Sequence, residues 1–304
     1  MLILNSLFPV MVIILLGYAL KRYGLTNTTF LQTSDKLVYT LFFPLMLFWK
    51  IGSSSFENGI DLSLVVAVLL ALGCMFILSL VLIALLRIPD FKAGSFAQSC
   101  YRFNTYIGVA VILTSLGEEG IGYFGIVIAL AIPLINVAAV TTLIWFSQEK
   151  MTGVHRLRLM IRALLSNPLI IGCVAGIIYA RGFSDFPGFL DNTLGLLSMV
   201  TLPLALLSIG GSLSFAGLRQ HAFLSLAAAV AKLAVFPLIG FFFLDMLGVV
   251  GTPFKVGMIF FSLPTSTAIY VLSSQMHSDT ELASTAILIS TLLSFPVLTF
   301  VLLL

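Results

Sequence analysis

The chain has 304 residues, of which 60% are hydrophobic and 9% are charged, and its mean hydropathy is +1.16. A soluble globular domain is far less apolar, with roughly half of its residues apolar and about a quarter charged. The composition therefore predicts a polytopic membrane protein and excludes a sizeable soluble domain. The net charge of +3 arises mostly between the apolar runs, so it indicates membrane topology and not nucleic-acid binding.

The sequence predicts an all-α integral membrane protein with ten transmembrane helices. A hydrocarbon core of roughly 30 Å requires about 20 apolar residues for each helical span. The first run is expected to remain as a span, since its basic residues follow it, the reverse of a signal peptide. The runs cover residues 3 to 20, 37 to 51, 62 to 86, 95 to 116, 121 to 146, 160 to 180, 190 to 212, 222 to 245, 254 to 276 and 282 to 304.

Basic residues are distributed unequally between the loops on the two sides. The richer side is expected to be cytoplasmic, so both termini face outward, toward the periplasm. The basic connector between the fifth and sixth runs is interpreted as an anchor that sets the membrane topology. A regulatory or nucleotide-binding role for it is the alternative. One side holds Lys21, Arg22, Lys36, Arg87, Lys92, Lys150, Arg156, Arg158, Arg162 and Arg219, and the other holds Lys50, Arg181 and Lys255.

An internal repeat divides the chain into two halves of five spans. Because five is odd, the second half must enter the membrane upside down, which predicts two inverted repeats, 1–146 and 160–304, joined by a cytoplasmic connector, 147–159. A shift of 159 residues lays Pro9 on Pro168, Gly17 on Gly176, Arg22 on Arg181, Pro44 on Pro203 and Gly52 on Gly211. With a shift of 163 residues, FKAG at Phe91 to Gly94 meets FKVG at Phe254 to Gly257.

The fourth and ninth runs are interrupted at their centres by polar residues. The fourth contains RFNTYIG, Arg102 to Gly108, and the ninth contains LPTST, Leu263 to Thr267. A proline and several hydroxyl groups at this depth open a helix, and lipid offers no partner to the exposed backbone groups. Paired breaks near the membrane midplane, one in each half, are typical of the substrate site of a secondary transporter.

The substrate is therefore expected between the two breaks, where half-helix N-termini attract anions and C-terminal carbonyls attract cations. Glycine there permits close backbone approach. The alternative is that the polar side chains only cap the broken backbone and that Tyr270 only packs against neighbouring side chains. The predicted substrate-binding residues are Arg102, Asn104, Thr105, Gly108, Pro264, Thr265, Ser266, Thr267 and Tyr270.

Two basic residues lie inside predicted spans. A central arginine costs about 2.5 to 3.5 kcal/mol on insertion scales and is normally retained for a function. Arg102 suits a carboxylate or a gate, although it lies close enough to the cytoplasmic end of its span for its stem to snorkel. Lys232 either attracts an anionic substrate or places its ammonium against carbonyls at a helix break, in place of a coupling cation.

Acidic residues are expected only at or near the ends of the spans, which weighs against a cation exchanger built on a central carboxylate pair. The three histidines, His155, His221 and His277, are expected in loops, so no proton carrier stands out. The sequence shows no metal-ligand cluster, cofactor motif, or nucleophile with an adjacent base, and an enzyme is not expected.

Several motifs together resemble the auxin efflux carrier family, which includes the PIN-formed plant exporters and bacterial permeases such as malonate transporters. The resemblance covers nearly the whole chain. The motifs are NTYIG at Asn104 to Gly108, NPLIIG at Asn167 to Gly172, LPLALLSIGGSL at Leu202 to Leu213, KLAVFP at Lys232 to Pro237 and LPTSTAIYVLSSQM at Leu263 to Met276.

The resemblance implies a scaffold of spans 1, 2, 6 and 7 that commonly forms a homodimer, and a moving transport domain of spans 3–5 and 8–10. Family members carry organic anions by elevator-type alternation. Plant carriers have proline directly before the crossover asparagine, whereas Phe103 precedes Asn104 here, beside Arg102. RFNTY resembles a bacterial subgroup, so we expect a small carboxylate and an inner-membrane location. The rival hypotheses are a cation or proton exchanger, and a channel or ligand sensor.

Overall fold

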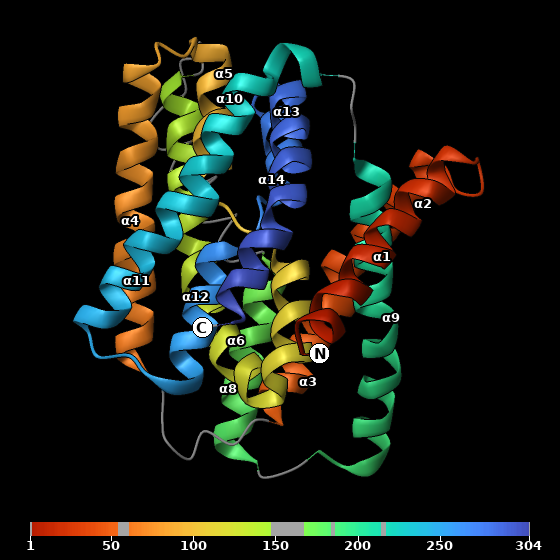
Figure 1. Cartoon of the computed structure of the whole chain (residues 1–304). Coiled ribbons are helices and arrows are strands. Elements are labelled where there is room, and N and C mark those ends of the chain that lie inside the picture. The colour runs from red at the N-terminus through yellow and green to blue at the C-terminus, as the bar shows by residue number, and fades with distance from the viewer. Residues whose placement is uncertain (1, 54–60, 147–166, 184–185, 214–216, 304) are drawn as a thin grey trace. The chain divides into compact units, whose positions relative to one another are not determined.

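The computed structural model describes residues 2–53, 61–146, 167–183, 186–213 and 217–303, which form helices and no strands (Figure 1). The predicted connector 147–159, with Lys150, Arg156 and Arg158, lies outside these residues. The helices are α1 (Leu2–Arg22), α2 (Thr28–Leu37), η1 (Val38–Phe42), α3 (Phe43–Gly52), α4 (Leu62–Leu85), α5 (Asp90–Tyr101), α6 (Thr105–Phe146), α8 (Pro168–Gly182), α9 (Gly188–Ser212), α10 (Leu218–Val230), η2 (Ala231–Val235), α11 (Phe236–Met246), α12 (Gly251–Ser262), α13 (Ala268–Gln275) and α14 (Thr280–Val301).

The apolar helical architecture predicted from composition is confirmed, and every predicted run contains helix. Five helical stretches in the described part of the chain are long and apolar enough to cross a membrane by length and composition, and shorter apolar helices lie between them. The five stretches are Leu62–Leu85, Asp90–Phe146, Gly188–Ser212, Leu218–Met246 and Thr280–Val301. The inverted relation between the halves of the chain stays a prediction.

Helix boundaries differ from the predicted runs where capping decides them. The helix that covers the second predicted run begins at Thr28, with α2, and not near residue 37. Its start is fixed by Asn27, whose side chain accepts a hydrogen bond from the Phe30 N–H at 2.8 Å. Because α2 is largely polar, the hydropathy of the sequence does not show where this helix begins. Within α6, Gly117 has φ 69° and ψ −155°, which interrupts the helix between the fourth and fifth predicted runs.

Two π-helical turns, η1 and η2, each lie just before a proline. Pro44 and Pro237 occupy the first turns of α3 and α11 and cannot donate to the carbonyl four residues earlier. A π-turn shifts the hydrogen-bond register, which accommodates the missing donor without ending the helix. The helix therefore continues from α10 through η2, which contains Lys232, to α11.

The described residues fall into two compact units, each considered by itself. The first unit comprises Met1–Leu62, Tyr106–Ala129 and Leu165–Leu213, and the second comprises Ser63–Thr105, Leu130–Leu164 and Ser214–Leu304. In the first unit α1 packs along α9, and α3 packs along α8. In the second unit α10 packs along α14 and α11 along α12, while α5 contacts both α10 and α14 (Figure 1).

Glycines bring helix backbones together in the first unit. A Cβ atom at Gly17 of α1 would clash with the carbonyl oxygen of Leu207 in α9, and one at Gly176 of α8 would lie 3.0 Å from the carbonyl oxygen of Phe48 in α3. The shift of 159 residues that relates Gly17 to Gly176 also relates Phe48 to Leu207. The two helix pairs therefore make corresponding contacts, in which close backbone approach replaces interdigitated side chains.

We predict that Gly17→Ala lowers the melting temperature of the purified protein, because the new methyl group would force α1 away from α9. Gly73→Ala is the matched control, since Gly73 lies within α4 and a Cβ atom there would meet nothing within 4 Å. Alanine in an open helical position normally stabilises by about 0.5 to 1 kcal/mol. Equal melting temperatures for the two variants would contradict the close α1–α9 contact.

Candidate functional site

The helices are broken at both predicted places. α5 ends at Tyr101 and α6 begins at Thr105, while α12 ends at Ser262 and α13 begins at Ala268. The residues that follow the two helices have closely similar extended backbones: Arg102 has φ −69° and ψ 140°, and Leu263 has φ −66° and ψ 144°. The chain therefore leaves both helices in the same manner.

A backbone hydrogen bond joins the two breaks within the second unit. The Asn104 N–H donates to the Pro264 carbonyl oxygen at 2.9 Å. Nearby, the Thr265 hydroxyl donates to the Ser99 carbonyl oxygen of α5 at 3.0 Å, and the Thr265 N–H donates to the Ser290 hydroxyl of α14 at 3.1 Å. The non-helical segments thus satisfy each other where water is scarce.

The side chain of Lys232, from η2, reaches the last turn of α12. Its ammonium donates to the Phe261 carbonyl oxygen at 3.3 Å and lies 4.4 Å from the centroid of the Phe236 ring. The side chain is fully buried. A carbonyl in the last turn of a helix lacks an intrahelical donor and carries partial negative charge, which a cation stabilises. This geometry corresponds to the structural use of Lys232 considered from the sequence, whereas a role in substrate binding stays a prediction.

Arg102 is half-buried at the first break. Its guanidinium donates to the Gln98 side-chain oxygen at 3.1 Å and to the Asn136 side-chain oxygen at 3.1 Å. These amide oxygens, on α5 and α6, fix the plane of the guanidinium. Both amides belong to apolar runs, and Gln98 precedes Arg102 by four residues, so a helical-neighbour search of the sequence would have identified it.

The other predicted site residues lie in several environments. Asn104 and Thr265 are 2% and 1% exposed, so a ligand reaches them only after a rearrangement. Ser266 accepts a hydrogen bond from the Ala268 N–H at 3.3 Å, capping the start of α13. Thr105 and Thr267 are half-buried, Pro264 is buried, Tyr270 is 46% exposed, and Gly108 is buried in the first unit.

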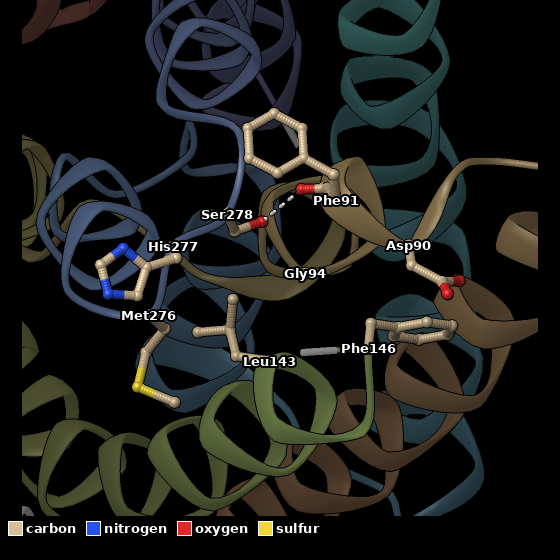
Figure 2. A pocket seen from close by; sticks show the side chains of 8 residues that line it. All are labelled: Asp90, Phe91, Gly94, Leu143, Phe146, Met276, His277 and Ser278. Atoms are coloured by element: carbon tan, nitrogen blue, oxygen red, sulfur yellow. Dashed lines mark hydrogen bonds between the residues drawn. The ribbon is translucent and has the colours of Figure 1, made fainter. Parts of the chain in front are cut away.

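Two cavities in the second unit are unsuited to hold a charged substrate as they stand. The cavity in Figure 2 has about 20 Å³, enough for one water molecule, and an apolar cavity between α4 and α6 has about 140 Å³. Neither is lined by a predicted substrate-binding residue. The first is lined by Asp90, Phe91, Gly94, Leu143, Phe146, Met276, His277 and Ser278.

A buried serine cluster beside that cavity was not predicted. The Ser95 hydroxyl donates to the Asp279 carbonyl oxygen at 2.7 Å and lies 2.8 Å from the Ser273 hydroxyl and 3.0 Å from the Ser278 hydroxyl. Figure 2 shows the Ser278 hydroxyl directed at the Phe91 carbonyl oxygen, 2.9 Å away. These bonds tie the start of α5 to the turn between α13 and α14.

The expectation that all histidines lie in loops is wrong for His221. It belongs to α10 and is 2% exposed, because the helix begins at Leu218, before the predicted run. Asp279 also differs from a solvated loop acid: it is 5% exposed, and its carboxylate accepts a hydrogen bond from the Leu282 N–H at 2.9 Å as the N-cap of α14.

We predict that Thr265→Val destabilises the protein by about 1 to 3 kcal/mol, because it leaves the buried Ser99 carbonyl oxygen without its hydroxyl donor. Thr265→Ser is the matched control, since it keeps the hydroxyl. Thermal unfolding in detergent measures the difference. If the valine variant is as stable as the serine variant, the Thr265 hydroxyl does not hold the two breaks together.

Comparison with known proteins agrees with this architecture. A family model described as membrane transport protein matches residues 2–302. An uncharacterized transporter of Methanocaldococcus jannaschii is 26% identical over 296 residues, covering 95% of this chain and 94% of its own length. An uncharacterized transporter of Methanothermobacter thermautotrophicus is 25% identical with the same coverage. The chain therefore belongs to the membrane transport protein family, the auxin efflux carrier family that its motifs resemble.

Proposed function

We propose that this membrane protein is a secondary transporter of a small organic anion, in particular a carboxylate. The observation that carries the proposal is the position of Arg102, whose guanidinium lies at a helix break and is oriented by the amide oxygens of Gln98 and Asn136. A guanidinium presents a planar fork of N–H donors that matches a carboxylate. The two amide oxygens hold this fork in place at the break.

The start of α6 strengthens the same preference. Thr105 is the first residue of α6, three positions after Arg102, and the first N–H groups of a long helix carry partial positive charge. A carboxylate between Arg102 and this helix start would meet both. Asn104 and Thr265 would take part after the rearrangement that their burial requires.

Lys232 argues against sodium as an obligatory partner at the second break. Its ammonium already lies against the Phe261 carbonyl oxygen, where a coupling cation would bind. Together with the placement of the carboxylates at span ends, this contact favours anion transport over the cation-exchanger alternative. A channel or sensor on the same fold is the remaining alternative.

The division into two units supports an elevator-type mechanism. Both breaks and Lys232 belong to the second unit, so that unit could carry the substrate as one body. The first unit contains the helices assigned to a dimer-forming scaffold. Residues 106–129, which the predicted transport domain includes, fall in the first unit instead. We also propose that the protein works as a homodimer in a bacterial inner membrane, with both termini outside.

The proposal predicts that one or more small carboxylates raise the melting temperature of the wild-type protein. A ligand that binds only the folded state at 100 times its Kd stabilises by about 2.7 kcal/mol. Arg102→Gln should abolish the shift, and Lys255→Gln, which removes an exposed cation from α12, should retain it. Counterflow of the radiolabelled carboxylate in proteoliposomes then tests transport. A melting temperature that responds only to sodium, equally in all three proteins, would favour the exchanger.

Lys232→Met separates the two uses of Lys232, because methionine preserves most of the side-chain volume and removes the charge. If the ammonium only satisfies the Phe261 carbonyl oxygen, the variant keeps the carboxylate-induced rise in melting temperature, whatever its basal stability. We expect this result. Loss of the rise in Lys232→Met, with a folded protein by size-exclusion chromatography, would instead assign Lys232 to the substrate.

A further inference from the structure

His221 lies between two carboxylates at one end of the second unit. Its Nδ1 atom is 3.8 Å from Asp279 Oδ2, and its Nε2 atom is 3.5 Å from Glu281 Oε2. The imidazole and the Asp279 side chain are buried, whereas the Glu281 side chain is 65% exposed. In the part of the chain that the structure describes, the buried Nδ1 atom has no hydrogen-bond partner.

A neutral imidazole cannot present an N–H group to both carboxylates. It has one N–H donor and one nitrogen lone pair, so one of its nitrogens must turn a lone pair toward a carboxylate. One additional proton removes the conflict by forming an imidazolium that is a donor at both nitrogens. The exposed Glu281 carboxylate, 3.5 Å from Nε2, lies between the ring and water, which would supply this proton and receive it again.

Other charged groups surround this cluster without pairing with the imidazole. α5 also packs against α10 and carries Asp90 and Lys92 in its first turn, and Arg219 and His277 are near neighbours in sequence of His221 and Asp279. Among the described residues, only Asp279 and Glu281 have carboxylate oxygens within 4.0 Å of the imidazole nitrogens. Lys232 lies 11 residues beyond His221, roughly 16 Å along the helix.

Asp279 connects the imidazole to both broken helices. Its carbonyl oxygen accepts from the Ser95 hydroxyl of α5, and its N–H donates to the Phe91 carbonyl oxygen at 3.0 Å. Ser95 in turn contacts Ser273 of α13. Hydrogen bonds therefore link Asp279 to α5 and, through Ser95, to α13, and these helices adjoin the two breaks.

A buried polar row extends from the same cluster toward the crossover. On α10 and η2 it contains His221, Ser225 and Lys232, and the Ser225 hydroxyl has no hydrogen-bond partner among the described residues. On α14 it contains Thr285 and Ser290, and Ser290 accepts from the Thr265 N–H at the second break. Of these groups, the His221 Nδ1 atom and the Ser225 hydroxyl lack a hydrogen-bond partner among the described residues, and a buried polar atom of this kind requires one.

We propose that His221, Asp279 and Glu281 form a proton-binding site whose occupancy biases the position of the broken helices and couples transport to pH. The coupling rests on the proposed anion transport, whereas proton binding does not. The function so defined is proton-dependent movement of the anion, with no requirement for a carboxylate at the crossover itself.

Proton binding is tested by NMR titration of isotope-labelled histidine side chains in the intact detergent-solubilised protein. His221→Gln and His277→Asn assign the signals; asparagine suits the φ of 53° at residue 277. We expect one imidazole signal, missing only in His221→Gln, to shift as the pH is lowered and the ring takes up a proton. In Asp279→Asn with Glu281→Gln, its midpoint should move to lower pH, because the imidazolium loses both counter-charges. No titration of that signal, or an unchanged midpoint, would overturn the proposal.

Coupling is tested by carboxylate counterflow in proteoliposomes at matched internal and external pH. The wild type and His277→Asn should change rate several-fold between about pH 5.5 and 8, and His221→Gln should show a flat profile. A flat wild-type profile, or an unchanged profile in His221→Gln, would overturn the coupling. Absence of counterflow in every protein, with the NMR titration as expected, would refute anion transport and leave the proton site intact.

Discussion

The structure depends on how two opened helices satisfy their backbone groups away from water. An unpaired peptide group in hydrocarbon costs several kcal/mol, so a break within a span requires a partner from another segment. The hydrogen bond from the Asn104 N–H to the Pro264 carbonyl oxygen makes each break the partner of the other. The Thr265 hydroxyl and the Lys232 ammonium satisfy carbonyl oxygens at the ends of α5 and α12 in the same way. Neither break is stable in this form without the other.

This mutual dependence explains why the second unit holds most of the buried polar side chains described here. Ser290 supports Thr265, and the serine cluster around Ser95 fixes the ends of α5 and α13 remote from the breaks. The first unit is held differently, by glycines that let helix backbones touch, as at Gly17 and Gly176. The second unit is held instead by hydrogen bonds that buried hydroxyl groups make between helices.

The sequence predicted the broken helices well because polar residues and proline are conspicuous within apolar runs. Arg102, Asn104 and Pro264 could not belong to an uninterrupted lipid-facing helix, whatever the fold. The repeat in the sequence relates Gly17 to Gly176 by one shift, and in the structure both glycines lie where two helix backbones approach closely. Helix starts were less accessible: α2 begins within a polar segment, and His221 was assigned to a loop because α10 starts before hydrophobicity rises.

Contacts between distant segments were beyond sequence analysis for a physical reason. Serine and threonine in a span commonly bond to the preceding turn of their own helix, so Ser95, Ser273 and Ser290 carry no signal that they meet other helices. Their partners depend on how α5, α13 and α14 pack. The same holds for His221 and Asp279, which are separated by 58 positions and joined only by the packing of α10 against α14.

Charge is separated along the second unit in a way that relates its two proposed sites. The cations Arg102 and Lys232 lie at the breaks, whereas Asp279 and Glu281 lie at the far ends of α13 and α14 with His221. Both groups contact the same helix, because α5 (Asp90–Tyr101) contains Ser95 and is followed directly by Arg102. If a proton at one end and an anion at the other favour the same arrangement of these helices, linkage requires each to strengthen binding of the other. Coupling then needs no carboxylate at the crossover. The acidic residues can remain at the span ends, where the free-energy cost of desolvating a carboxylate is smallest.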